Sequence, residues 1–305
     1  MRDFDSSTPV VVLTAQIAAL HVMRSLGKKG VSVYAVDSAR DLPALRSRYC
    51  AGTLSLDLSA GDSAAVAEQL VEWGRRQFSR PAVLFWTSDE TAVLCARHYD
   101  LLSECFLMPR NDVELIDRLQ DKAGMYELAQ EHGVPVPHTD FPQSKADVRR
   151  LAEEVAYPIL LKGIIGTRLL ERTGRKMKFA YSPEELIRLY EEMEDPNIPN
   201  IMLQEVIPGD DDQVYIFNGY FDHDSECLSP YTGHKLRQYP VHRGCASLGI
   251  NETNEKVSEL TRSFMKALGY RGILDIGYRL DPRDGRYKVL DVNPRIGQAF
   301  RIFVG

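Results

Sequence analysis

The chain has 305 residues, 44% of them apolar and 26% charged, and a formal net charge of −6. This composition is typical of a folded globular protein and excludes a disordered chain. The acidic excess argues against a general nucleic-acid binder, while leaving room for a local basic pocket for phosphate. No apolar run approaches the about 20 residues of a membrane-spanning helix, and the polar N-terminus lacks the apolar stretch of a signal peptide. Five widely spaced cysteines form no C-x-x-C pair, which favours reduced thiols in a cytoplasmic protein.

Residues 1–110 alternate short apolar runs with helical patterns. We expect strands at 10–13, 31–36 and 82–86, and helices at 17–26 and 62–79. Alternation with short links predicts a parallel sheet covered on both faces, as in a Rossmann-like α/β domain. The turn after the first strand lacks the glycine fingerprint of a dinucleotide site. Asp37 ends the second strand and could mimic a ribose ligand, but an ordinary polar strand end is the favoured interpretation.

Residues 111–305 have a different pattern, which predicts a second domain of the α+β class. Helices are expected at 111–120, 122–132, 144–156, 182–194 and 252–268, several of them preceded by a residue that can cap them. The segments at 157–162 and 201–209, and most of the chain after 209, are strand-like. At about 150 residues per domain, the length also favours two domains.

Lys162 closes an apolar strand in this second region. An unpaired ammonium group is costly to bury, so a bound phosphate is a natural partner for it. The glycine-containing turn 163–166 and the basic residues of 168–178 fit a mobile flap over a polyphosphate. A snorkelling surface lysine and a solvated basic loop are the plain alternatives. No P-loop pattern is present.

Asp291 and Asn293 alternate on one predicted strand, so both side chains face the same side. A carboxylate and an amide oxygen are hard ligands suited to Mg²⁺, which takes few protein ligands together with phosphate oxygens. Arg295 lies on the same face if the strand continues, and its planar guanidinium group suits phosphate or carboxylate.

Several short motifs occur in one order along the chain: Asp121-Lys122 with Gly133–Pro137, Tyr157–Lys162, Gln204–Gly209 and Leu290–Arg295. This order resembles the ATP-grasp superfamily, and within it the carboxylate–amine ligases similar to D-aspartate ligase and carbamoyl phosphate synthase. The segment Gly233–Pro240 gives weaker support for that placement. Each motif alone is weak, but the set is specific and spans about residues 110–300. With the N-terminal unit, the resemblance covers nearly the whole chain.

The resemblance implies a Rossmann-like domain at 1–110 and an ATP-grasp domain at 111–305, with a small subdomain at about 122–200 and a large one at about 201–305. ATP would lie between these α+β subdomains. Lys122 and Lys162 would contact its phosphates, and one acid of 210–212, with Asp212 favoured, would bind the ribose. The hinge that reads the adenine edge would comprise Gln204, Glu205, Val206 and Ile207.

For the metal, the resemblance implies that Asp291 and Asn293 hold Mg²⁺. Arg295 would steady the transferred phosphate or an acyl-phosphate. Lys235 and Arg237 lie where such proteins often place phosphate or substrate contacts.

The sequence also departs from the family pattern. Gly277 stands where a further metal-binding acid is expected, so either Asp275 replaces that acid or a second metal is held weakly. Asp291 is one methylene shorter than the usual Glu. The chain ends soon after Arg295, which leaves open a truncated chain or a compact member.

The leading interpretation is an ATP-dependent ligase that joins a carboxylate to an amine through an acyl-phosphate. The chemistry depends on positioning and charge neutralisation, which fits the lack of an obvious catalytic His or Cys. A non-catalytic or regulatory ATP-binding protein is the alternative, and a dehydrogenase is disfavoured. The sequence does not name the two small-molecule substrates, which include amino acids as candidates. No nucleic-acid or membrane partner is expected, and a homodimer is the default assembly.

Overall fold

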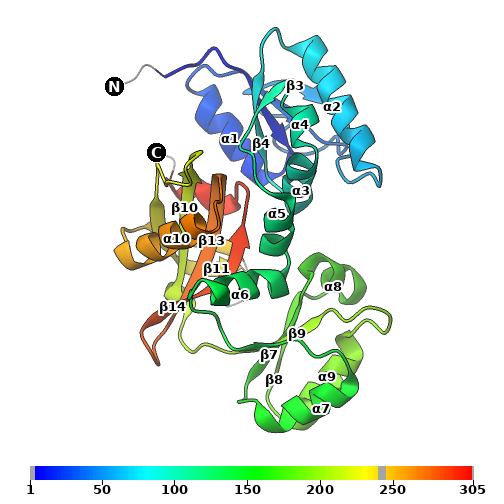
Figure 1. Cartoon of the computed structure of the whole chain (residues 1–305), viewed down its shortest axis with the longest axis vertical. Coiled ribbons are helices and arrows are strands. Elements are labelled where there is room, and N and C mark those ends of the chain that lie inside the picture. Colours follow the sequence, from blue (N-terminus) through cyan, green and yellow to red (C-terminus); the bar gives the residue numbers. More distant parts are fainter. Residues whose placement is uncertain (1–3, 240–244, 304–305) are drawn as a thin grey trace.

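The computed structural model describes residues 4–239 and 245–303 and contains three β-sheets, one parallel and two antiparallel (Figure 1). The parallel sheet lies at one end of the molecule, a small antiparallel sheet lies at the other, and a larger one lies between them. Within the described ranges, no helix is long and apolar enough to cross a membrane.

The N-terminal sheet has the strand order β3-β2-β1-β4-β5, and every neighbouring pair is parallel. Its central strand is apolar on both sides: Val11 and Leu13 pack into one core, and Val10 and Val12 pack into another. This burial on both faces explains the continuous apolar run. The strands are β1 (Val10–Leu13), β2 (Val33–Val36), β3 (Cys50–Leu54), β4 (Ala82–Trp86) and β5 (Phe106–Leu107). The helices are α1 (Ile17–Gly27), α2 (Ser63–Gln77), α3 (Asp89–Arg97) and α4 (Tyr99–Leu102).

Two short helices, α5 (Val113–Gln120) and α6 (Lys122–Glu131), follow this sheet. Each begins at an aspartate whose carboxylate accepts a backbone N–H of the first turn: Asp112 from Glu114, and Asp121 from Gly124. These caps satisfy orphan donors and fix where each helix starts. The second cap therefore determines that Lys122 is the first residue of α6.

The small sheet has the order β6-β9-β7-β8 and two chemically different faces. One face packs against α7 and α9 in a separate apolar core that includes Leu161 and Leu203. In the register of β7 and β9, Leu160 lies opposite Gln204 and Lys162 opposite Met202, so these four side chains share the other face. The strands are β6 (Thr139–Asp140), β7 (Ile159–Gly163), β8 (Met177–Ala180) and β9 (Ile201–Glu205). The helices are α7 (Lys145–Glu154), α8 (Gly166–Thr173) and α9 (Pro183–Met193).

The large sheet has the order β12-β11-β10-β13-β14 and is antiparallel throughout. Helix α10 (Glu255–Ala267) packs its apolar side chains into the core of this sheet. The strands are β10 (Val214–Phe221), β11 (Tyr231–Tyr239), β12 (Cys245–Asn251), β13 (Gly272–Asp281) and β14 (Arg286–Asn293). Short 3₁₀ turns cover η1 (Asp211–Gln213) and η2 (Gln298–Phe303).

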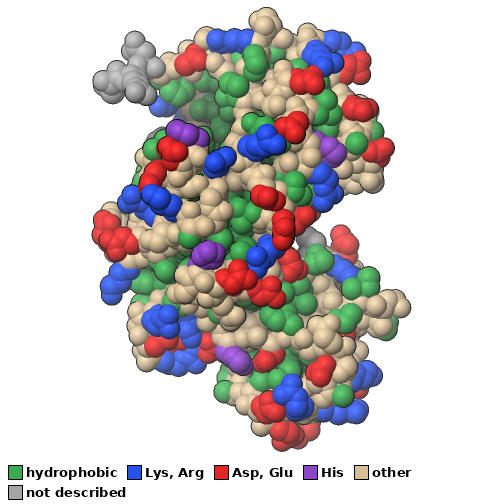
Figure 2. All heavy atoms as spheres, in the orientation of Figure 1, with side chains coloured by type: hydrophobic (Ala, Val, Ile, Leu, Met, Phe, Trp, Pro, Cys, Tyr) green, Lys and Arg blue, Asp and Glu red, His purple; other side chains and the backbone are tan. Residues whose placement is uncertain are grey.

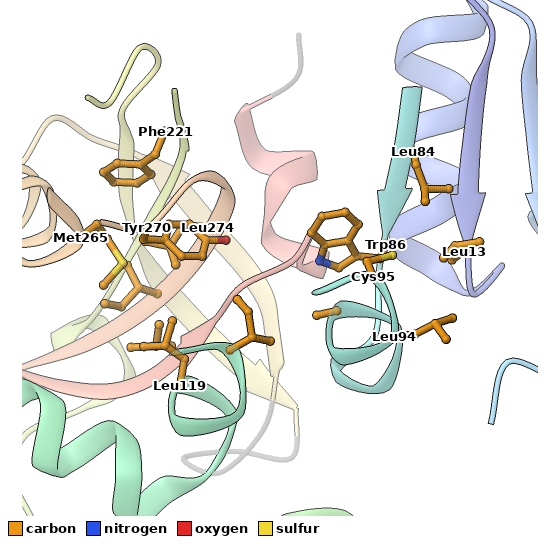
Figure 3. Packing of buried hydrophobic residues seen from close by; sticks show 14 of the residues in the cluster. Leu13, Leu84, Trp86, Leu94, Cys95, Leu119, Phe221, Met265, Tyr270 and Leu274 are labelled. Carbon is orange, nitrogen blue, oxygen red and sulfur yellow. The ribbon is translucent and has the colours of Figure 1, made fainter. Parts of the chain in front are cut away.

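One apolar core runs from the N-terminal sheet into the large sheet. Figure 3 shows Leu84 and Trp86 on the side of the N-terminal sheet, and Tyr270 and Leu274 on the side of the large sheet. The indole N–H of Trp86 donates to the carbonyl of Pro294, 2.7 Å away, just beyond the end of β14. The N-terminal sheet is therefore docked directly against the chain that leaves β14.

The predicted class, α/β followed by α+β, is confirmed. The predicted helices and most strands appear within a few residues of their expected bounds, while β3 was missed because its half-exposed residues form no continuous apolar run. The basic segment 163–178 differs from the expected loop, because its centre folds into α8, which ends at Gly174 in the left-handed conformation.

Candidate active site

Lys122 and Asp291 form an ion pair between α6 and β14. The Lys122 side chain is 15% exposed and that of Asp291 is 46% exposed. Burial works against the charge of Lys122, but the carboxylate of Asp291 more than compensates and raises the lysine pKa. Desolvation also opposes the charge of Asp291, yet Lys122 and Lys162 hold the pKa of this carboxyl well below its usual range. The pair is therefore fully charged at neutral pH.

Lys162, on β7, lies near the Lys122–Asp291 ion pair, but its own charge is not balanced by an ion pair among the described residues. Burial, helped by the nearby charge of Lys122, lowers the pKa of Lys162 to about 8, although Asp291 acts in the opposite direction. Among the described residues, Lys162 makes no ion pair within 4.0 Å. An anion that entered here would stabilise its ammonium form.

Asp291 begins a chain of contacts that leads to the N-terminal sheet. The amide of Asn293 donates to Asp291 over 3.2 Å, and the Arg295 guanidinium donates to Oδ1 of Asn293 over 3.0 Å. Nε of Arg295 also donates to Asp89, the first residue of α3. We call Lys122, Asp291, Asn293, Arg295 and Asp89 the cleft network. Sequence reasoning missed Asp89 because its partner lies 206 positions away.

The predicted hinge, residues 204–207, comprises the last two residues of β9 and the two that follow it. The buried Gln204 side chain donates to the Tyr126 hydroxyl over 2.7 Å and to Thr139 over 3.0 Å, so it ties β9 to α6 and β6. The carbonyl of Ile207 accepts a 3.1 Å hydrogen bond from Arg279. Val206 lies between these fixed residues and is half-buried.

The side chain of Glu205 forms ion pairs with the β13–β14 hairpin. It forms ion pairs with Arg283 (2.6 Å) and Lys288 (2.8 Å), and Lys288 also pairs with Asp281 (2.7 Å). Arg283 pairs with Asp281 as well, and the Asp281 side chain is only 1% exposed. We call Glu205, Asp281, Arg283 and Lys288 the hinge cluster, because it joins β9 to the β13–β14 hairpin.

The three acids at 210–212 differ in their surroundings. Asp211 is buried and accepts hydrogen bonds from the backbone and side chain of Gln238, at 2.9 and 3.0 Å, which fixes η1 against β11. Asp212 is exposed, and Gln213 donates to it over 3.1 Å. Asp210 is also exposed. The preference for Asp212 over Asp211 as a ribose ligand agrees with these positions and stays a prediction.

Asp275 and Gly277 lie on one face of β13, next to the strand that carries Asp291. Asp275 is opposite Asn293, and Gly277 is opposite Asp291. The amide of Asn218 donates to Asp275 over 2.7 Å, and burial raises the pKa of this carboxyl to about 6. A Cβ atom added at Gly277 would meet no described atom within 4 Å apart from its chain neighbours. Gly277 therefore leaves open space directly above its backbone, opposite Asp291.

Lys235 and Arg237 both lie on β11. Lys235 donates to Gln238 over 3.3 Å, and its charge helps to keep Asp275 ionised. Arg237 is exposed and donates to Ser247 on β12 over 3.3 Å. Lys235 therefore lies near Asp275, whereas the hydrogen bond of Arg237 leads to the edge strand β12.

Three basic residues of the expected flap pair with the end of α9. Arg168 contacts Asp195 at 2.5 Å, Lys178 contacts Glu192 at 2.6 Å, and Arg172 donates to the carbonyl of Glu194. The expectation that these side chains are available to cover a polyphosphate is therefore not met in this structure. The acidic residues at 192–195 provide local partners that the sequence argument did not consider.

The residues fit one Mg²⁺ ion with few protein ligands. Asp291 is ionised, half-exposed and already bound to a cation, the ammonium of Lys122. Asn293 lies beside it and provides an amide oxygen. A metal bound there would complete its shell with phosphate oxygens and water. No group of three His, Cys, Asp or Glu residues that could hold a metal occurs in the described part of the chain.

Comparison with known proteins connects this geometry to ligases. The chain is 30% identical over 236 residues to D-aspartate ligase of Enterococcus faecium, a match that covers 72% of this chain and 55% of that protein. It is 29% identical over 198 residues to the carbamoyl phosphate synthase large chain of Thermus thermophilus, covering 60% and 18% of the two chains. This chain therefore spans about half the length of the first relative and less of the second. No family model matches it.

Solved structures show the same fold. The L-amino acid ligase from Bacillus licheniformis superposes with a TM-score of 0.70 at 15% identity, covering 98% of this chain and 70% of that one. The biotin carboxylase domain of 2-oxoglutarate carboxylase from Hydrogenobacter thermophilus, in complex with MgADP, gives 0.66 at 18% identity, with coverages of 94% and 64%. The expected resemblance to the ATP-grasp superfamily is thus confirmed at the level of fold.

Proposed function

We propose that this chain, which has the ATP-grasp fold, is an ATP-dependent carboxylate–amine ligase. The observation that carries the proposal is the convergence of Lys122 from α6, Lys162 from β7 and Asp291 from β14 on one cleft, two of them already paired. Two cations and an ionised carboxylate in one place suit a magnesium–polyphosphate. The similarity to D-aspartate ligase supports amide formation as the reaction.

In this proposal, the phosphates of ATP lie between the small and large sheets. Lys162 and Lys122 donate to phosphate oxygens, and Asp291 and Asn293 hold Mg²⁺, which neutralises phosphate charge when bound. The backbone of 204–207 reads the adenine edge, and Asp212 binds the ribose. Because the Ile207 carbonyl already accepts a hydrogen bond from Arg279, the other backbone groups of the hinge form the hydrogen bonds to the adenine base.

The substrate carboxylate attacks the terminal phosphorus of ATP, and ADP leaves. The resulting acyl-phosphate is held by Arg295 with Lys235 nearby. An amine then attacks the acyl carbon and displaces phosphate, giving an amide. The protein contributes position and positive charge to both steps, which is sufficient for phosphoryl and acyl transfer in a site closed to water. The substrates are small molecules, with amino acids the first to be tested, and we propose that the reaction takes place in the cytoplasm.

The test is a phosphate-release screen over pairs of amino acids, followed by mass spectrometry of the products. We expect release that requires both a carboxylate and an amine, with a product lighter by one water than the sum of the two. Release with a carboxylate alone, or with no added substrate, would contradict the ligase assignment.

A non-catalytic ATP-binding protein is the second candidate, and Gly277 is the observation that favours it. The open space opposite Asp291 leaves one carboxylate where a pair could hold metal more firmly. This candidate predicts tight ATP binding by calorimetry together with no phosphate release from any pair of substrates.

A further inference from the structure

Asp89 is a charged residue of the cleft to which the proposed reaction assigns no task. It is the first residue of α3, and Ser88 caps that helix by accepting the backbone N–H of Thr91 over 3.3 Å. Oδ1 of Asp89 accepts from Nε of Arg295, and the Asp89 side chain remains 48% exposed. The carboxylate is therefore anchored on a rigid element and accessible at the same time.

Asp89 lies beside the point where the N-terminal sheet changes direction. From β1 the chain builds β2 and β3 on one side, and then β4 and β5 on the other. In open parallel sheets, ligands bind in the crevice outside the carboxyl ends of the strands at such a point. Asp89 follows the end of β4 by three residues, and Arg295 reaches it from the large sheet.

The backbone at this crevice is strained. Thr14, the residue after β1, has a φ of 66°, which is rare for a β-branched residue. The hydroxyl of Thr87 donates to the carbonyl of Thr14 over 2.7 Å, and the hydroxyl of Thr14 donates to Ser88 over 3.3 Å. Strain that is held in place by neighbouring hydrogen bonds is concentrated at ligand sites.

The charges around the crevice define what Asp89 can bind. Lys122, Lys162 and Arg295 attract anionic groups, and the same charges repel a cationic amine. The proposed function already assigns Asp291 to Mg²⁺, and the carboxylate of Asp275 accepts from Asn218. Asp89 is paired with Arg295, to which the proposal assigns the acyl-phosphate, but its side chain stays 48% exposed, so its carboxylate can still accept from a ligand.

We propose that Asp89 binds the ammonium group of the amine substrate and places its nitrogen beside the acyl-phosphate on Arg295. This inference rests on the ligase function proposed above and extends it by assigning the amine site. The substrate class is a primary amine that is protonated at neutral pH, such as an amino acid. The Asp89–Arg295 contact keeps the two substrate-binding groups side by side.

The ammonium loses one proton to water and becomes the nucleophile. Its nitrogen forms a bond to the acyl carbon, and the bond from that carbon to the phosphate oxygen breaks, with its electron pair leaving on phosphate. The second proton passes from the new amide nitrogen to the released phosphate or to water.

The test compares two nucleophiles on one acyl-phosphate. Hydroxylamine is mostly uncharged at neutral pH and traps acyl-phosphates as hydroxamates without needing an ammonium site. We expect Asp89→Asn to lower kcat/KM for the cationic amine about 10–150-fold more than for hydroxylamine, the range for losing a charge-assisted contact. The KM of the amine should carry most of this change.

Asp89→Glu keeps the charge and should recover much of the ratio. Asp117→Asn is the matched control. Asp117, on α5, is also 48% exposed, and it pairs at 3.7 Å with Arg97, which lies on α3 like Asp89. An equal loss with both nucleophiles would overturn the proposal and leave Asp89 as a tether for Arg295. A ratio unchanged in a folded Asp89→Asn protein, judged by thermal denaturation, would also overturn it. Absence of hydroxamate and of ADP with the wild-type protein would refute the ligase function itself.

Discussion

The cleft network and the hinge cluster both join distant parts of the chain through charged side chains, but they differ in how their charges are matched. The hinge cluster contains two carboxylates and two cations, and its Asp281 side chain is 1% exposed. In the cleft, Lys162 makes no ion pair with any described residue, and the carboxylates of Asp291 and Asp89, although paired with Lys122 and Arg295, stay about half-exposed. A matched and buried cluster stabilises one arrangement, whereas an unpaired cation beside accessible ion pairs can take up a ligand.

The acidic and basic side chains on the surface do not reveal this difference. On the face drawn in Figure 2, red and blue side chains are intermingled and no large area has a single sign. Charge sign alone therefore does not locate the site. Its location follows from Lys162, which has no ion pair among the described residues, and from the half-exposed ion pairs beside it, and these pairings require the structure.

The largest effect should come from Asp291→Asn. The substitution keeps the shape of the side chain but removes the ionised oxygen that the proposal assigns to Mg²⁺. We expect turnover to fall below detection while the fold persists at lower stability, because the 15% exposed Lys122 loses the carboxylate that balances its charge. Product formation and circular dichroism measure the two effects. Turnover near the wild-type rate would show that the metal is held elsewhere.

Asp281→Asn should instead affect stability. It leaves Arg283 and Lys288 without their buried partner, and breaking a buried ion pair costs about 3–5 kcal/mol. We expect the lower end of this range, since Arg283 remains half-exposed. Urea denaturation measures the loss, and kcat of the folded fraction should stay close to wild type. Asp284→Asn is the control, because Asp284 lies 4.0 Å from Lys288 on the exposed side and should change stability little.

Lys162→Met should weaken ATP binding about 10–150-fold, the range for losing a charge-assisted contact. It should not destabilise the empty protein, because it replaces a poorly matched ammonium group with an apolar side chain of similar length. Calorimetric titration with ATP and thermal denaturation measure the two quantities. Unchanged ATP affinity would remove Lys162 from the phosphate site.

The smallest effect concerns protons. Folding lowers the pKa of Lys162 from 10.5 to about 8, so between these values the unfolded chain binds more protons than the native protein. The contribution of this group to stability should therefore increase as pH rises through that window, and be least favourable below pH 8. Phosphate binding restores the charge, so ATP binding near pH 9 should take up a fraction of a proton. Titrations in buffers of different ionisation enthalpy measure this uptake, and Lys162→Met should abolish it.

The sequence predicted the fold and the candidate residues that local patterns identify. Lys122 follows a helix cap, Lys162 closes a strand, and Asp291 and Asn293 alternate on another strand, so each was visible from its neighbours. Asp89 was not predicted, nor were the ion pairs that Glu205 makes in the hinge cluster, because the partners are contributed by segments far away in the chain. In the sequence, Arg283 and Lys288 have no feature that distinguishes them from ordinary surface charges. Only the folded β13–β14 hairpin places them against Glu205.

The separate apolar cores should give different parts of the molecule different stabilities against unfolding. One core runs from the N-terminal sheet into the large sheet and takes in Met202 of β9, whereas the other face of the small sheet closes a separate core against α7 and α9. The first two sheets should therefore unfold as one cooperative unit, while the small sheet can fluctuate or open as a separate one. Since Lys162 is carried by the small sheet and Asp291 by the large one, the two sides of the cleft belong to different cooperative units. Opening for product release would then move the smaller unit and expose Met202, whose side chain is buried in the larger core.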